Sequence, residues 1–158
     1  MKSTRRQILK QGGGMTLFTL VGAAGWLVPG TAGAQGAWNK VAFETKTMDE
    51  TTKALGGGTA TQSKDVTFFS TPDIAENGAV VPIGVTSTIP KTESIAILVE
   101  KNPNMLAAVF DIPAGTDPSL STRVKMGQTS NVYALVKADG KFYVASKEIK
   151  VTLGGCGG

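Results

Sequence analysis

The residue best suited to chemistry in this sequence is Cys156, the only cysteine of the chain, which stands two positions before its end. A lone cysteine is most often a small buried hydrophobe, but burial needs apolar neighbours, and glycine has no side chain to pack. We therefore expect the last five residues to form a mobile arm that leaves the thiol exposed and gives it reach and clearance to enter a partner's cleft. The glycines of this arm are Gly154, Gly155, Gly157 and Gly158.

No residue of the arm would activate this thiol. A free thiol has a pKa of roughly 8.5, and only the thiolate is a strong nucleophile. An activated catalytic cysteine needs a neighbouring base or cation, whereas the chain contains no histidine at all and has no lysine next to Cys156. The sequence therefore predicts a passive attachment point on which other proteins act, and not an enzyme.

The same composition limits metal sites and disulfides. With one cysteine and no histidine, the chain cannot assemble a zinc, haem or copper site of the usual kinds, or an internal disulfide. We therefore expect no metal site and no cofactor. In an oxidising compartment, an odd cysteine indicates either intermolecular pairing or a free reactive thiol.

Other charged residues are weaker candidates for a site. Acids beside turns usually accept hydrogen bonds from backbone N–H groups, so we favour a structural role for them over acid–base work. Arg123 and Lys125 alternate with apolar residues and predict the solvated face of a strand. The carboxylate pairs considered are Asp111 with Asp117 and Asp73 with Glu76.

The first 34 residues are typical of an export signal. A basic start precedes a short apolar run, and Ala32-Gly33-Ala34 matches a small-x-small cleavage site. The apolar run is shorter than the roughly 20 residues needed to cross a bilayer, so we expect cleavage and no stable membrane insertion. Arg5 and Arg6 lie in the segment Thr-Arg-Arg-Gln-Ile-Leu-Lys, which resembles the twin-arginine signal of proteins exported already folded. An uncleaved N-terminal anchor is the alternative.

Cleavage would change the charge balance of the chain. Four of the 16 basic residues and none of the 12 acidic residues lie in the signal, so the mature chain would carry twelve of each. A nearly neutral chain without a basic block lacks the electrostatic footprint of a nucleic-acid-binding protein. We therefore expect no nucleic-acid partner.

The elements that must position the arm begin with a helix and continue as strands. Residues 38–55 predict one short N-terminal helix with an apolar stripe, and Gly56–Asp65 predicts a flexible loop. Pro82 inside an apolar run predicts an edge strand or a bulge, and Asp139-Gly140 between two runs predicts a tight hairpin. The residues of the helix stripe are Trp38, Val41, Met48 and Leu55.

Seven or eight short runs rich in β-branched and aromatic residues follow the loop, separated by turn residues. With no long helix between them, they predict an all-β fold, an Ig-like antiparallel β-sandwich that occupies residues 35–153 and precedes the arm at 154–158. The runs are Val66–Phe69, Ala79–Val85, Ser94–Glu100, Leu106–Ile112, Ser121–Met126, Asn131–Ala138, Lys141–Ser146 and Glu148–Leu153.

The terminal Gly-Gly-Cys-Gly-Gly, preceded by Val-Thr-Leu, resembles the C-terminus of the SoxY family, the sulfur carriers of the thiosulfate-oxidising Sox system. The resemblance implies a periplasmic β-sandwich that forms a heterodimer with SoxZ and carries covalent sulfur intermediates on its cysteine, here Cys156. Further matches are Pro72–Val85, Ile97–Ile112, Ser121–Met126 and the signal segment Thr4–Lys10.

The resemblance also implies the proteins that act on the arm. A c-type cytochrome would couple thiosulfate oxidatively to Cys156, and a dimanganese hydrolase would then release sulfate and leave a persulfide. In some organisms a sulfane dehydrogenase would oxidise the remaining sulfur. The alternative is an exported structural or binding module that is crosslinked through an intermolecular disulfide at Cys156, although a static crosslink does not need four glycines.

Overall fold

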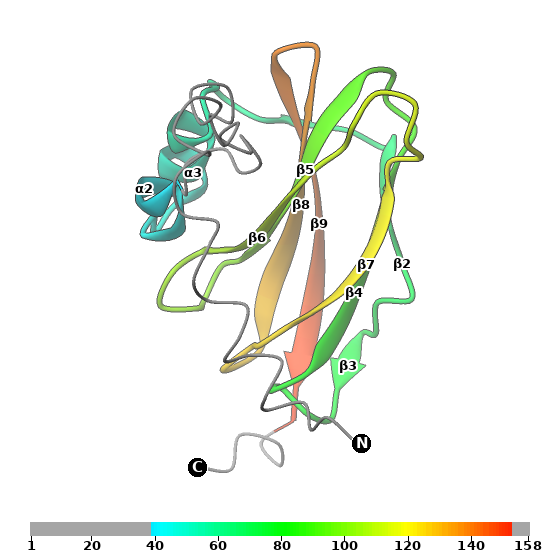
Figure 1. Ribbon diagram of the computed structural model, residues 1–158. Helices are drawn as coiled ribbons and strands as arrows, with labels where there is room; N and C mark the ends of the chain where they lie inside the picture. Colours follow the sequence, from blue (N-terminus) through cyan, green and yellow to red (C-terminus); the bar gives the residue numbers. More distant parts are fainter. Residues whose placement is uncertain (1–38, 153–158) are drawn as a thin grey trace, which may run out of the picture. The chain divides into compact units, whose positions relative to one another are not determined.

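The computed structural model describes residues 39–152, which form a sandwich of two β-sheets (Figure 1). The all-β sandwich predicted from the sequence is confirmed, and most of its strand pairs are antiparallel. The larger sheet has the order β1 (Thr61–Gln62), β9 (Lys141–Val151), β8 (Ser130–Ala138), β5 (Thr92–Val99), β6 (Leu106–Asp111), with β3 (Ile74–Ala75) also paired to β9. The smaller sheet has the order β2 (Val66–Phe69), β4 (Val81–Ser87), β7 (Ser119–Val124).

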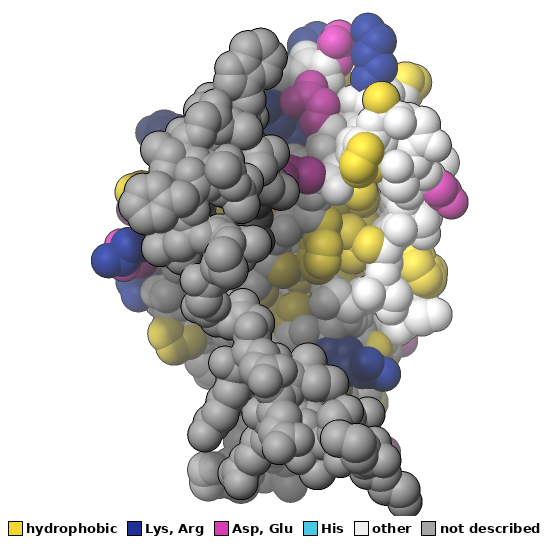
Figure 2. Space-filling model, in the orientation of Figure 1, with side chains coloured by type: hydrophobic (Ala, Val, Ile, Leu, Met, Phe, Trp, Pro, Cys, Tyr) yellow, Lys and Arg dark blue, Asp and Glu magenta, His cyan; other side chains and the backbone are white. Residues whose placement is uncertain are grey.

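The main hydrophobic core lies between the two sheets. Alternate residues of each strand point into it, as Ile95, Ile97 and Val99 do from β5 and Ile83 and Val85 do from β4, and all five are fully buried. Burying a side chain of this size contributes about 1.5–3 kcal/mol. On the face drawn in Figure 2, hydrophobic side chains are visible between β6 and β7, the strands that end the two sheets.

The N-terminal helix prediction is wrong in detail, because two short helices form instead of one: α2 (Lys40–Phe43) and α3 (Met48–Ala54). The chain breaks before α3 because Thr47 caps it: the Thr47 side chain accepts from the Glu50 N–H, and the Glu50 carboxylate accepts from the Thr47 N–H. With the helix broken, the expected stripe does not hold, and Val41 is 68% exposed. Trp38 lies outside the described residues.

The two helices cover the outer face of the larger sheet (Figure 1). Ala42 of α2 is fully buried there, in a second cluster with Leu98, Leu135 and Phe142, and Met48 and Leu55 pack against it. The larger sheet is therefore buried on both faces where the helices lie, which the sequence analysis did not anticipate.

The predicted flexible loop at Gly56–Asp65 is instead part of the sheet. Its residues Thr61 and Gln62 form β1, which pairs in parallel with β9. Gly57 lies so close to the Phe142 ring that an added Cβ would stand 1.9 Å from the ring. The segment is thus ordered at Gly57 and at β1, although most of its residues are exposed, and β1 and β3 are parallel exceptions to the antiparallel prediction.

The predicted hairpin forms, whereas the prediction that Pro82 marks an edge strand or a bulge is wrong, because Pro82 pairs in unbroken register with Arg123 of β7. Asp139 and Gly140 have φ values of 50° and 72°, as a tight primed turn requires, and Ala138 pairs with Lys141 across it. Pro82 lies in β4, the middle strand of its sheet, but β2 pairs with β4 only from Gly84 onward. The Gly84 N–H faces the β2 side, so the nitrogen of Pro82, two residues earlier, faces the same side where β2 has already ended.

The last two predicted runs form one strand. Lys147 separates them in the sequence, yet it pairs with Val132 of β8, and β9 continues without a break to Val151. Leu153, the expected last residue of the domain, lies outside the described residues. The end of β9 is therefore the part of the fold from which the C-terminal segment departs.

Candidate functional site

The predicted functional residues Cys156, Gly154, Gly155, Gly157 and Gly158, and the signal residues Arg5 and Arg6, lie outside the described residues. What the structure does describe is the strand end that leads to them. Thr152 is the last described residue, four positions before Cys156. The candidate site is therefore built from the contacts that hold the end of β9.

The end of β9 is hydrogen-bonded on both sides. On one side, the Lys150 N–H donates to the Asp73 carbonyl at 2.9 Å, and the Thr152 N–H donates to the Ala75 carbonyl at 3.1 Å. On the other side, the Val151 N–H donates to the Thr129 hydroxyl at 3.0 Å. The Thr152 hydroxyl also donates to the Glu76 carbonyl at 3.4 Å. The polypeptide is thus fixed up to Thr152.

Residues 71–76, which we call the strap, provide most of these contacts. The strap leaves the smaller sheet after β2 through Ser70, whose φ of 47° turns the chain, and it then joins the larger sheet as β3. It therefore crosses from one sheet to the other just beside the end of β9. The two residues of β3, Ile74 and Ala75, pair in parallel with Lys150 and Val151.

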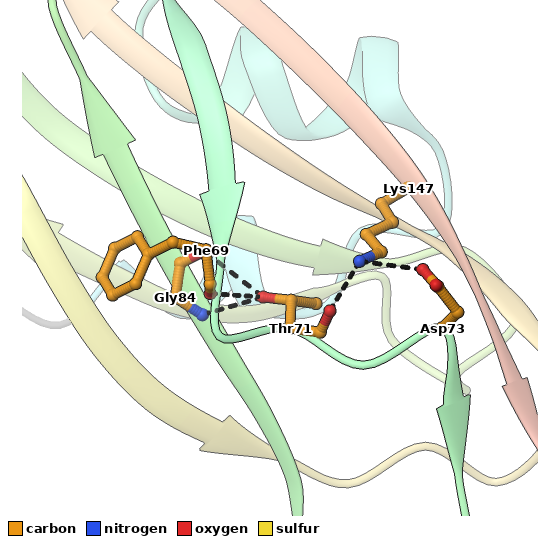
Figure 3. Close-up of polar contacts among 5 residues, drawn as sticks. All are labelled: Phe69, Thr71, Asp73, Gly84 and Lys147. Carbon is orange, nitrogen blue, oxygen red and sulfur yellow. Dashed lines mark hydrogen bonds and ion pairs between the residues drawn. The ribbon is translucent and has the colours of Figure 1, made fainter.

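Thr71 ties the strap to the smaller sheet (Figure 3). Its hydroxyl accepts a hydrogen bond from the Gly84 N–H at 3.0 Å and donates to the Phe69 carbonyl at 3.0 Å. Gly84 allows this approach because a Cβ there would stand 2.3 Å from the Phe69 carbonyl oxygen. Thr71 is buried, and its side chain takes the place of a backbone partner for β4 beyond the end of β2.

Lys147 of β9 ties the strap to the larger sheet (Figure 3). Its ammonium group donates to the Thr71 carbonyl at 2.5 Å and pairs with the Asp73 carboxylate at 3.0 Å. The Lys147 side chain is only 27% exposed, whereas that of Asp73 is 88% exposed. The same strap residue, Asp73, thus accepts from the Lys147 side chain and from the Lys150 backbone.

The four acidic residues considered in the sequence analysis are all exposed. Asp73 and Glu76 belong to the strap, and the contacts of Asp73 are with Lys147 and the Lys150 N–H. Asp111 and Asp117 are exposed at the end of β6 and in the following loop. Arg123 and Lys125 are exposed, which confirms the solvated face.

Lys147, Thr71 and Thr129 were not identified from the sequence. One signal for Lys147 was present: it shares the core-facing side of β9 with Ala145 and Ile149, because side chains two residues apart lie on one face of a strand. A lysine at such a position needs a buried partner for its charge. Its partners could not be located, because Thr71 lies 76 positions away in the chain.

Three groups with shifted pKa values lie away from the strap. The Lys46 N–H, and then the Thr47 N–H and hydroxyl, lower the pKa of Glu50 against a smaller opposing effect of burial. The Gly140 N–H and the Lys137 ammonium lower the pKa of Glu93. Burial, followed by the hydrogen bond to Glu100, raises the pKa of Tyr133. These shifts follow from structural hydrogen bonds and packing.

Two further observations concern ligands and membranes. Within residues 39–152, no three acidic, cysteine or histidine side chains gather where they could hold a metal ion. No described helix is long and apolar enough to cross a bilayer.

A cleft of about 690 Å³ lies between the β4–β5 and β6–β7 connections. It is at the opposite end of β8 from the strap, because β8 ends at Ala138 beside Thr92 and begins at Ser130 beside Ile149.

Comparisons with known proteins agree with this architecture. The sequence profile of the family "Sulfur oxidation protein SoxY" matches residues 51–156. A solved structure of the sulfur carrier protein SoxY from Chlorobium limicola f thiosulfatophilum is 36% identical, covers 64% of this chain and 93% of that chain, and superposes with a TM-score of 0.56. A comparison with curated protein sequences found no match.

Two other solved structures are less similar. A chain from a study of T cell activation by the bacterial superantigen toxic shock syndrome toxin-1 is 13% identical, with 55% of this chain and 98% of that chain covered and a TM-score of 0.40. The human F-spondin reeler domain is 8% identical, with 59% and 94% covered and a TM-score of 0.39.

The fold and the strap define a β-sandwich protein that fixes the end of its last strand immediately before a C-terminal cysteine segment. The family profile matches more than half of the chain, and the match runs through Cys156. The chain belongs to the SoxY family.

Proposed function

We propose that this protein is a covalent sulfur carrier and that Cys156 is its attachment site. The observation that carries the proposal is that the match to the sulfur oxidation family extends through Cys156. The anchored strand end supports it, because Thr152 is held by the strap only four residues before the cysteine. The relative that is 36% identical is described as a sulfur carrier protein.

The chemistry of the carrier uses the thiol as a handle. In the loading step, the Cys156 sulfur forms a disulfide bond with the outer sulfur of thiosulfate, the thiol proton leaves, and two electrons pass to a c-type cytochrome. In the next step, a dimanganese hydrolase would catalyse the attack of water on the terminal sulfonate. Sulfate leaves, and a persulfide remains on Cys156. A sulfane dehydrogenase would oxidise that remaining sulfur. Each step needs a partner, because no group beside Cys156 in the sequence lowers the pKa of its thiol.

The proposal includes the compartment and the main partner. Export through Arg5 and Arg6 by the twin-arginine route would deliver the folded chain to the periplasm, already paired with SoxZ. Gly154, Gly155, Gly157 and Gly158 would give the cysteine reach and clearance in the partner enzymes. The carrier itself needs no metal or cofactor for this role, because its contribution is a reversible covalent attachment.

The test is the intact mass of the protein, isolated from the periplasm without reductant, beside a Cys156→Ser variant. We expect added sulfur atoms or a thiosulfonate group on the wild-type chain and an unmodified mass for the variant. A wild-type species at twice the chain mass that collapses on reduction would contradict the proposal, and would indicate a module crosslinked through Cys156. Sulfur adducts that persist in the variant would place the attachment elsewhere.

A further inference from the structure

The strap is the main support of the last two residues of β9, Lys150 and Val151, and of Thr152, which follows the strand. Pairing between β8 and β9 ends with Ser130 opposite Ile149. Beyond Ile149, β9 is held by the strap carbonyls and by one bond from the Val151 N–H to Thr129. If the strap detached, the chain beyond Ile149 would be held by the Val151–Thr129 bond and by the packing of Val151 against the core.

The strap cannot depend on its strand pairing alone. Its β-strand, β3, is two residues long, and so short a pair closes too few hydrogen bonds to offset the entropy of ordering the chain. Lys147 adds two charge-assisted contacts, to the Thr71 carbonyl and the Asp73 carboxylate, and such bonds are roughly twice as strong as neutral ones. Because the Asp73 side chain is 88% exposed, solvent weakens the ion pair, and the bond to the Thr71 carbonyl is the less exposed of the two contacts.

We propose that Lys147 is a positioning residue for the sulfur-carrying arm: it holds the strap against β9 and so fixes Thr152 as the origin of the segment that bears Cys156. This inference rests on the proposed carrier function. With the origin at Thr152, four residues span to the cysteine and reach at most about 14 Å. In the limiting case, in which Val151 also leaves Thr129, the origin is Ile149, and seven residues span to the cysteine and reach at most about 25 Å.

A longer tether lowers the concentration of the cysteine at any one place. The effective concentration falls with about the −3/2 power of the tether length. Lengthening from four to seven residues therefore lowers it about twofold. Release of the strap should slow partner-dependent loading of Cys156 by at most about that factor, while the intrinsic reactivity of the thiol stays the same.

The experiment uses the full chain, with a nitroxide label on Cys156, the only cysteine. We compare wild type with Lys147→Met, which keeps the aliphatic stem and removes the ammonium group. We expect the label of the variant to broaden amide signals farther along β8 and β9, away from the strap. The matched control is Lys150→Met, an exposed lysine of the same strand whose backbone N–H, and not its ammonium group, bonds the strap.

A conservative substitution of Lys147 and a variant of its partner Asp73 complete the test. Lys147→Arg should restore the wild-type label pattern, because a guanidinium can donate to both the Thr71 carbonyl and the Asp73 carboxylate. Asp73→Asn, at an 88% exposed side chain, should give an intermediate pattern even if Lys147→Met folds poorly. Identical label patterns in wild type, Lys147→Met and Asp73→Asn would overturn the inference, as would equal changes in Lys150→Met.

A kinetic measurement separates positioning from a general loss of structure. We expect Lys147→Met to be loaded with thiosulfate by the oxidising cytochrome more slowly than wild type, by at most about twofold, and to react with a small aromatic disulfide at the wild-type rate. Equal slowing in both reactions would contradict a positioning role. If wild type is not loaded at all, the carrier function fails, whereas the label pattern still tests the role of Lys147.

Discussion

Replacing Thr71 with valine should destabilise the fold through one lost hydroxyl. Valine has nearly the same shape as threonine, so packing is kept, but the Gly84 N–H loses its acceptor and the Phe69 carbonyl loses a donor. The site is buried, and leaving such a polar group unpaired costs about 1–3 kcal/mol. With both groups affected, we expect the free energy of unfolding to fall by about 2–3 kcal/mol.

Urea unfolding, followed by circular dichroism, measures this loss. For a small domain, the free energy of unfolding changes by about 1–3 kcal/mol per molar urea, so the midpoint of Thr71→Val should fall by about 0.7–3 M. Thr71→Ser keeps the hydroxyl and is the matched control, with a much smaller shift. A Thr71→Val midpoint within experimental error of Thr71→Ser would show that the hydroxyl is not the link between the strap and the smaller sheet.

Two other substitutions test local features. Gly84→Ala should lower the free energy of unfolding by about 1–3 kcal/mol, because its Cβ would stand 2.3 Å from the Phe69 carbonyl oxygen and the backbone must shift; a wild-type thermal midpoint would contradict this. Glu50→Gln should reduce the loss of unfolding free energy that the wild-type protein shows as the pH falls below neutral. The pKa of Glu50 is lowered in the folded state, so its contribution is present above the unfolded value of about 4.3 and is lost as the pH falls through the folded pKa. Urea midpoints of the two proteins that keep a constant difference between pH 7 and pH 3 would refute this assignment.

The strands were predictable because their signals are local. β2 begins and ends where the run Val66–Phe69 does, and strands β4 to β9 lie within a few residues of their runs, whereas β1 and β3 had no predicted run. The Asp139-Gly140 hairpin followed from residue types that tolerate positive φ. Each of these signals is contained in fewer than ten consecutive residues, so no knowledge of distant contacts was needed.

The helix and loop predictions failed because each of them relied on one local signal alone. The stripe that included Val41 assumed one continuous helix, but the capping residues Thr47 and Glu50 start a new helix in the middle of it. The glycines after α3 indicated a flexible loop, but Gly57 is required by the Phe142 ring that packs on it. A local capping signal decided the first case, and tertiary packing decided the second.

The positions of the titratable groups bear on the part that the strap plays. Within the described residues, the groups with shifted pKa values are Glu50 in the helices, Glu93 at the far end of β5, and Tyr133 in the middle of β8. Asp73 and Lys147, which do lie beside the end of β9, are paired with each other. These contacts give the strap a mechanical part, fixing the chain at Thr152.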